Sequence, residues 1–132
     1  MTAKKSALSL RERVLSPLSG FRIKSVVVPE WDGMEVKIRE PSAQAWVEWN
    51  EIIYPPVPDD GTEVQLTAAQ TAHRNLRADV VLFTDVLLDE ESMPVFLPED
   101  RELVQGIYGP VHSRLLKQAL NLGTTQEDAG EK

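Results

Sequence analysis

Two segments near the start of the chain alternate apolar and polar side chains in the manner of β-strands. The first, Phe21 to Val28, is rich in β-branched residues, and the second, Met34 to Arg39, places charged residues between apolar ones. The apolar residues of the second strand, which we expect to face the core, are Met34, Val36 and Ile38. Between the strands, the Asp32-Gly33 pair readily adopts the positive φ angles of a tight turn. The pattern predicts a β-hairpin over residues 21–39.

Apolar residues three or four positions apart predict three helices around this hairpin. A short one covers residues 6–16, with Ser6 as its N-cap. A second covers residues 42–53, and its Ser42 hydroxyl is placed to accept a backbone N–H. A third begins at the capping box formed by Thr67 and Gln70 and runs to about residue 88. The expected core-facing residues of the second and third helices are Trp46, Trp49, Ile52, Ile53, Leu76, Val80, Phe83 and Leu87.

Two further helices should follow an acidic loop over residues 89–97. Pro98 and Pro110 each suit a first helical position, where no backbone N–H is needed, and Gly123 is placed to cap the last helix. Their expected core-facing residues are Leu103, Val104, Ile107, Val111, Leu115, Leu116 and Ala119. The elements predict a small, single-domain, predominantly helical α+β fold with four to five helices and one N-terminal β-hairpin. We divide it into an N-terminal helix or arm (1–20), an α+β domain (21–123) and a disordered tail (124–132).

Composition and charge narrow the class of partner. The 132 residues carry a net charge of -7, yet residues 1–40 hold eight Lys or Arg against five Asp or Glu, while the rest holds six against sixteen. An acidic body lacks the clustered cationic face that binds phosphate backbones, so we expect no nucleic-acid partner. The longest apolar stretches are too short to cross a membrane, and no secretory signal is present. The absence of cysteine fits a reducing cytoplasm.

Residues that could carry chemistry are few and scattered. His73 and His112 are far apart and lack metal-ligand spacing, and no phosphate-binding glycine loop or GxSxG elbow occurs. The densest feature is a group of carboxylates, Asp85, Asp89, Glu90, Glu91, Glu99, Asp100 and Glu102. An enzyme using this group is the alternative from another class, but acids at helix ends and in loops are usually solvated. We therefore expect no enzymatic activity, no cofactor and no metal.

The hairpin is the candidate protein-binding site. Trp31 lies at its tip, where the indole either folds back onto the adjacent helix or faces a partner. Arg39 should point outward beside an edge strand whose backbone groups are available to another chain, and the strand residues Met34 and Val36 complete the candidate set. The competing site is the acidic region 89–102, whose attraction for basic segments should be weaker and salt-sensitive. Three tryptophans and several leucine-rich helices also predict self-association.

Residues 26–42, Val-Val-Val-Pro-Glu-Trp-Asp-Gly-Met-Glu-Val-Lys-Ile-Arg-Glu-Pro-Ser, resemble the opening of the tail assembly chaperones of long-tailed, siphophage-type bacteriophages. The likeness consists of a strand, a turn with tryptophan, a second strand ending in arginine, and a Pro-Ser helix start. Counting the flanking strand and helix start, it covers about a quarter of the chain. The remaining helices agree with that family in number and length.

The resemblance implies a non-enzymatic protein that coats and solubilises the tape measure protein in the host cytoplasm and helps to recruit the tail tube protein. Such a protein is absent from the mature virion. It also implies association with a longer product of a programmed ribosomal frameshift. The chain ends Glu131-Lys132, whose codons permit a purine-rich slippery run. The main alternative within virion assembly is a small adaptor of the head-tail joining type.

Overall fold

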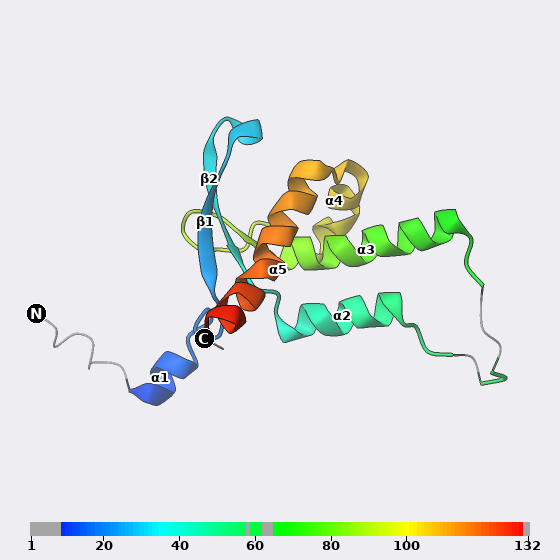
Figure 1. The fold of residues 1–132 in the computed structure, drawn as a ribbon, viewed down its shortest axis with the longest axis horizontal. Helices are drawn as coiled ribbons and strands as arrows, with labels where there is room; N and C mark the ends of the chain where they lie inside the picture. The colour runs from blue at the N-terminus through cyan, green and yellow to red at the C-terminus, as the bar shows by residue number, and fades with distance from the viewer. Residues whose placement is uncertain (1–8, 58, 62–64, 131–132) are drawn as a thin grey trace, which may run out of the picture.

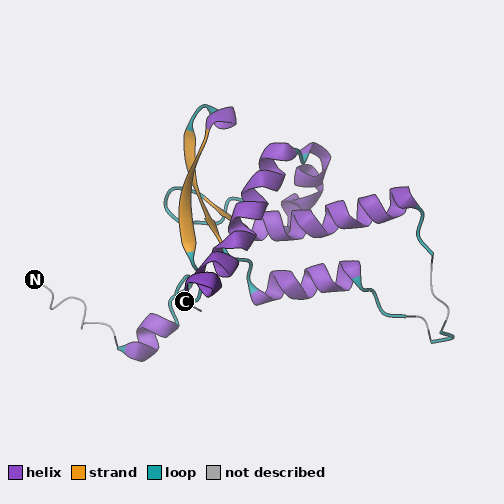
Figure 2. Cartoon of the chain, in the orientation of Figure 1, coloured by secondary structure: helices purple, strands orange, loops and turns teal. Residues whose placement is uncertain are grey.

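The computed structural model describes residues 9–57, 59–61 and 65–130 and confirms the predicted α+β class, with helices outnumbering strands (Figure 1, Figure 2). Its regular elements are α1 (Leu10–Val14), β1 (Ile23–Val28), β2 (Met34–Arg39), α2 (Ala43–Ile53), α3 (Ala68–Val86), β3 (Leu87–Leu88), α4 (Arg101–Ile107) and α5 (Pro110–Gly130). Two 3₁₀ turns are η2 (Pro29–Trp31) and η3 (Pro98–Asp100). No helix within these described ranges is long and apolar enough to cross a membrane.

The predicted hairpin is confirmed, and it belongs to a three-stranded antiparallel sheet of order β1-β2-β3. Asp32 and Gly33 have φ angles of 58° and 70°, as the Asp-Gly turn requires. The third strand was not predicted, because Leu87 and Leu88 continue the apolar stripe of the preceding helix. In the structure the helix ends at Val86, and the next two residues pair with Lys37 and Ile38 of β2.

The core lies where the sheet meets three helices. α2 and α3 run side by side, and α5 crosses the hairpin and packs against both β2 and α3 (Figure 1). Buried residues come from the sheet and from all three helices: Val28, Ile38, Ala45, Ala78, Phe83, Val86, Leu115 and Ala119. The long helix has its predicted capping box, Thr67 with Gln70, and α2 has its predicted Ser42 cap. Helical and strand periodicity thus identified most of the central core.

The predicted core face is wrong in four places. Trp46 of α2, expected to face the core, is 40% exposed, and Ala45 is the buried residue of that helix. Leu103 and Ile107 of α4 are 72% and 63% exposed, whereas Val104 between them is buried. α4 is short and packs against α3 along one narrow face, which leaves its other apolar residues in solvent. Met34 is 58% exposed, since it lies at the turn end of β2, beyond the buried residues Val36 and Ile38.

Both ends of the chain differ from the sequence expectation. α1 begins after Ser9, which forms a capping box with Glu12, whereas Ser6 and the first part of the predicted helix lie outside the described residues. At the other end α5 continues to Gly130, so the predicted cap at Gly123 is wrong. The backbone at this glycine stays helical, and its carbonyl oxygen accepts a hydrogen bond from Arg22 at 3.4 Å. The last two residues of the predicted tail, 131 and 132, lie outside the described residues.

Candidate functional site

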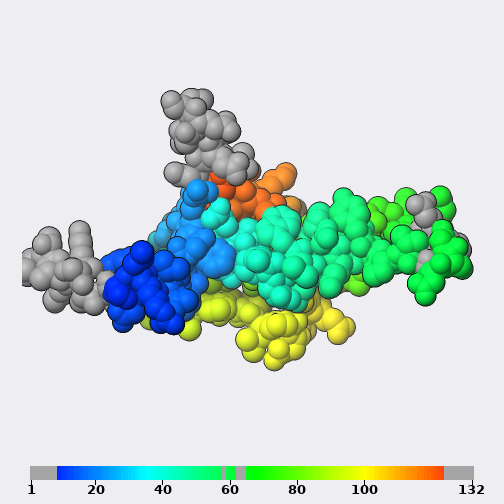
Figure 3. All heavy atoms as spheres, turned by 90° about the horizontal axis from the view of Figure 1, so that it is seen from below, coloured from blue at the N-terminus to red at the C-terminus, as the bar shows by residue number. Residues whose placement is uncertain are grey.

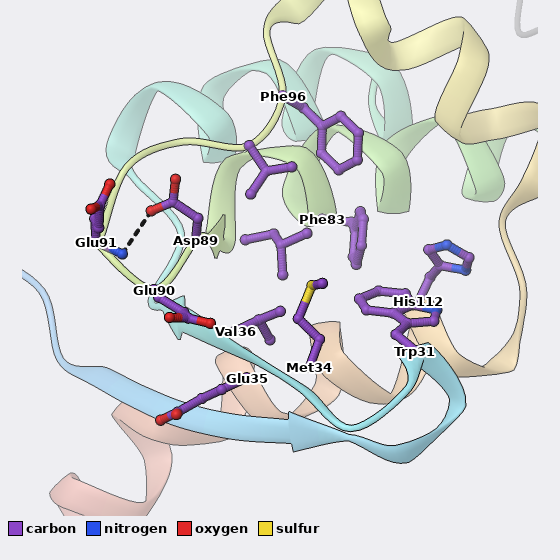
Figure 4. Close-up of a pocket in the computed structure, with 12 residues that line it drawn as sticks. Trp31, Met34, Glu35, Val36, Phe83, Asp89, Glu90, Glu91, Phe96 and His112 are labelled. Carbon is purple, nitrogen blue, oxygen red and sulfur yellow. Dashed lines mark hydrogen bonds between the residues drawn. The ribbon is translucent and has the colours of Figure 1, made fainter.

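A groove of about 540 Å³ opens between the turn end of the hairpin and the segment that joins α3 to α4 (Figure 4). We call this cavity the hairpin groove. Residues from η2, β2, α3, β3, the following loop and α5 surround it: Trp31, Met34, Glu35, Val36, Phe83, Leu87, Asp89, Glu90, Glu91, Val95, Phe96 and His112. Its apolar lining and its acidic residues lie at opposite sides, as Figure 4 shows.

The apolar side of the groove is built from packed aromatic rings. The Trp31 ring lies 5.7 Å from the imidazole of His112, which in turn lies 5.2 Å from the Phe83 ring. The backbone N–H of Gly109 donates to Nδ1 of His112 at 2.9 Å, so this nitrogen carries no proton. Burial lowers the pKa of His112. The imidazole is therefore uncharged at neutral pH and packs against the rings of both Trp31 and Phe83.

The acidic side consists of Glu35 on β2 and Asp89, Glu90 and Glu91 in the loop after β3. Asp89 Oδ1 accepts hydrogen bonds from the backbone N–H groups of Glu91 (2.8 Å) and Met93 (3.0 Å), which folds the loop back over the sheet. No Lys or Arg of the described residues forms an ion pair with these four carboxylates. Within the described part of the chain, the rim thus presents four carboxylates without an ion-pair partner to any molecule that enters.

Three of the four predicted binding residues meet in this groove, and the fourth does not. Trp31, Met34 and Val36 all line it. Both interpretations of Trp31 apply in part, because the indole packs back against the core and also contributes a wall of the groove. Arg39, expected to point outward, is instead held inside the fold.

Arg39 ties the sheet to two helices rather than facing a partner. Its guanidinium donates to both carboxylate oxygens of Asp85 on α3, at 3.2 and 3.3 Å, and lies 4.2 Å from the centre of the Phe21 ring. Asp85 also accepts from the backbone N–H and the hydroxyl of Ser42, at 2.7 and 3.0 Å. Because the side chain of Arg39 is only 12% exposed, its predicted outward orientation is wrong.

The carboxylate group considered for catalysis is spread over separate structures. Asp85 bonds Arg39 and Ser42, Asp89 shapes its own loop, and Asp100 Oδ2 accepts the backbone N–H of Leu97 at the start of η3. Within residues 9–57, 59–61 and 65–130, no group of three or more His, Asp or Glu side chains is placed to hold a metal ion. His73 lies exposed on α3, away from His112 on α5.

The groove residues that the sequence analysis did not single out for binding are Glu35, Phe83, Leu87, Val95, Phe96 and His112. Phe83 was predicted to belong to a core stripe, and this prediction is correct. Phe83 also lines the groove because the loop after β3 passes beside it. The fold of that loop depends on the pairing of β3, and periodicity alone gives no signal for a two-residue strand.

Comparisons with known proteins agree on one family. The family model described as phage tail assembly chaperone matches residues 9–132. Among solved structures, the tail assembly chaperone of bacteriophage HK97 superposes with a TM-score of 0.73 and is 50% identical in sequence. That match covers 86% of this chain and 95% of the HK97 chain. No curated protein matches. The chain therefore belongs to the phage tail assembly chaperone family.

Proposed function

We propose that this protein is a non-enzymatic chaperone that coats the tape measure protein in the host cytoplasm, keeps it soluble, helps to recruit tail tube subunits, and is absent from the mature virion. The family assignment favours tail assembly over head-tail joining. The observation that supports the finer proposal is the hairpin groove, a concave apolar surface at the site where the sequence places protein binding. Its polar rim groups are all acids on one side, which suits an apolar protein segment flanked by basic residues.

A coating chaperone acts in many copies, so contacts between copies belong to the same proposal. Exposed apolar residues are plentiful on the described surface, including Trp46 at 40% and Tyr54 at 68% on and after α2. Such residues become buried when a protein surface is covered. A longer frameshift product that begins with this chain would carry the same groove and join the same coat.

Co-expression with the tape measure protein tests the proposal. We expect the tape measure protein to stay in the supernatant after centrifugation when the wild-type chain is present and to pellet when it is absent. Met34→Asp, which places a charge inside the hairpin groove, should return most of it to the pellet. The control is Leu103→Asp, since Leu103 is at least as exposed as Met34 but lies outside the groove.

Two results would count against this function. One is a tape measure protein that remains equally soluble without the chain. The other is a wild-type chain that neither co-purifies with the tape measure protein nor changes its solubility. Equal loss of function in the Met34 and Leu103 variants would reject the groove as the site while leaving the chaperone role intact.

A further inference from the structure

The three-stranded sheet has one covered edge and one open edge. On the β3 side the following loop folds back over the strand, since a bridge joins Leu88 to Pro94 and the Asp89 N–H donates to the carbonyl oxygen of Met93 at 2.9 Å. On the other side β1 pairs with β2, and no further strand of the described residues follows it. Seen from the end at which β1 begins, the first hairpin residues lie at the molecular surface between α1 and α2 (Figure 3). We call the outer side of β1 the open edge.

The backbone groups of β1 face β2 and the open edge in turn. The Glu40 N–H donates to the carbonyl oxygen of Arg22 at 3.3 Å. Every second residue of an antiparallel strand faces the same neighbour, so residues 24, 26 and 28 also turn their backbone groups towards β2. Ile23, Ser25 and Val27 therefore turn theirs to the open edge. These three donors and three acceptors have no hydrogen-bond partner among the described residues.

The side chains at the open edge also suit an added strand. Ile23 and Val27 are 39% and 60% exposed, and they share one face of β1 with the exposed Ser25 between them. Edge strands are commonly protected by a proline or a bulge, but β1 contains no proline and its register with β2 is unbroken from Ile23 to Val28. A strand laid along this edge would cover both apolar side chains and satisfy the outward backbone groups.

The charges at the open edge favour an acidic partner segment. Residues 21–28 include Arg22 and Lys24 and no acid, although the whole chain carries a net charge of -7. Arg22 pairs with Glu40 at 3.2 Å, whereas Lys24 forms no ion pair among the described residues. Pairing with the β1 of a second copy would bring two more cations to the same edge. A segment with Asp or Glu opposite Lys24 would instead neutralise it.

We propose that the open edge of β1 is a second protein-binding site, which takes an extended segment of a partner tail protein. The segment adds a fourth strand, with β-branched residues opposite Ile23 and Val27 and a carboxylate opposite Lys24. No residue of β1 lines the hairpin groove, so the two sites are separate and one chaperone can hold two segments at once. This inference goes beyond the coating function and does not depend on it.

Amide hydrogen exchange of the wild-type chain tests the added strand. The probe is the acetylated and amidated peptide Thr-Val-Thr-Thr-Glu-Val-Thr, whose antiparallel pairing sets its Glu opposite Lys24. In the free chain the N–H groups of Ile23, Ser25 and Val27 should exchange faster than those of Lys24 and Val26, which face β2. Saturating peptide should slow the first three at least about tenfold and leave the other two nearly unchanged. The matched control is the same peptide N-methylated at the three residues that face β1, which should give no protection.

Two variants separate the backbone contact from the charge contact, with affinities measured by isothermal titration calorimetry. Ser25→Pro removes one outward N–H and should weaken peptide binding at least about tenfold, with little change in the urea midpoint because that N–H does not face β2. Lys24→Glu should weaken binding about two- to fivefold and should favour, by a similar factor, a peptide with Lys in place of Glu. Leu103→Asp lies outside β1 and should bind as wild type.

Four results would overturn the proposal. The first is no protection of Ile23, Ser25 and Val27 at millimolar peptide, and the second is equal binding of the N-methylated peptide. The third is protection in the free chain that rises with protein concentration, since it would show that a second copy occupies the edge. The fourth is an unchanged preference of Lys24→Glu for the acidic peptide, which decides the matter even where Ser25→Pro fails to fold. The tape measure protein takes no part, so these results are independent of the solubility test above.

Discussion

Replacing Asp85 with Ala should be among the most damaging single changes outside the apolar core. The carboxylate joins three elements, since it accepts two bonds from Arg39 of β2 and two from Ser42 at the start of α2. The side chains of Arg39 and Asp85 are 12% and 20% exposed, so water replaces the lost partner poorly. Alanine would leave a largely buried guanidinium and the Ser42 N–H without their acceptor.

The loss of unfolding free energy expected for Asp85→Ala lies between the values known for exposed and for buried ion pairs. Exposed ion pairs contribute roughly 0 to 1 kcal/mol, and removing one partner of a fully buried pair costs about 3 to 5 kcal/mol. For this mostly buried pair we expect a loss of about 3 kcal/mol in the free energy of unfolding. With a urea dependence of about 1.5 kcal/mol per molar, the unfolding midpoint should fall by about 2 M. Circular dichroism of α-helix content against urea concentration measures this shift.

Two further variants separate the charge from the packing. Arg39→Met combined with Asp85→Leu removes both charges and should recover a large part of the loss, because no isolated charge remains buried. Asp85→Asn keeps the shape and should fall between wild type and Asp85→Ala. The opposite result would be an unfolding midpoint for Asp85→Ala within about 0.3 M of wild type, equivalent to under about 0.5 kcal/mol. It would show that solvent screens the Arg39–Asp85 pair as it screens a surface ion pair, and that the large loss expected from burial is wrong.

Three other outcomes follow from the same structure. Trp31→Ala should weaken self-association and also lower stability by about 1 to 3 kcal/mol in urea titration, because the indole packs against the core as well as lining the groove. The lowered pKa of His112 means that the unfolded chain binds the proton first, so stability should fall as the pH drops below about 6.5. His112→Gln should flatten this dependence. The Arg114 guanidinium lowers the pKa of Glu30 to about 2. The contribution of this ion pair to stability should therefore persist above pH 4.5, disappear as the pH falls towards 2, and shrink in high salt. Carboxyl NMR titration would show the lowered pKa.

Prediction from sequence succeeded where a local signal was complete. The hairpin carries its strand pattern and its Asp32-Gly33 turn within residues 21–39, and both appear in the structure. The capping box at Thr67 likewise contains all the atoms it needs within four residues. Each of these features is decided by neighbours in the chain, so the sequence alone was sufficient.

Prediction from sequence failed where the burial or the contacts of a residue depend on packing against distant parts of the chain. Leu103, Val104 and Ile107 have the same apolar character and helical spacing, yet only Val104 is buried, although α4 as a whole packs against α3. The alternation along β2 directs Arg39 outward, but α3 lies close enough for Asp85 to accept a hydrogen bond from its guanidinium, which holds the side chain within the fold. A periodic pattern states which residues share a face, and it does not state how much of that face another element will cover.

The hairpin groove is the clearest feature that the sequence pattern could not predict, because it depends on how distant segments pack. Its loop wall exists because α3 ends at Val86 and the next two residues pair with Lys37 and Ile38. Had the helix continued through Leu88, as its apolar stripe favours, the chain would leave the sheet and the segment 89–97 would not return across it. The bridge between Leu88 and Pro94 and the bonds to Asp89 then close the loop beside Phe83 and Trp31. A two-residue strand thus brings the tryptophan predicted from the hairpin and the acids predicted as a rival site to opposite sides of one groove, so both sequence hypotheses describe parts of the same surface.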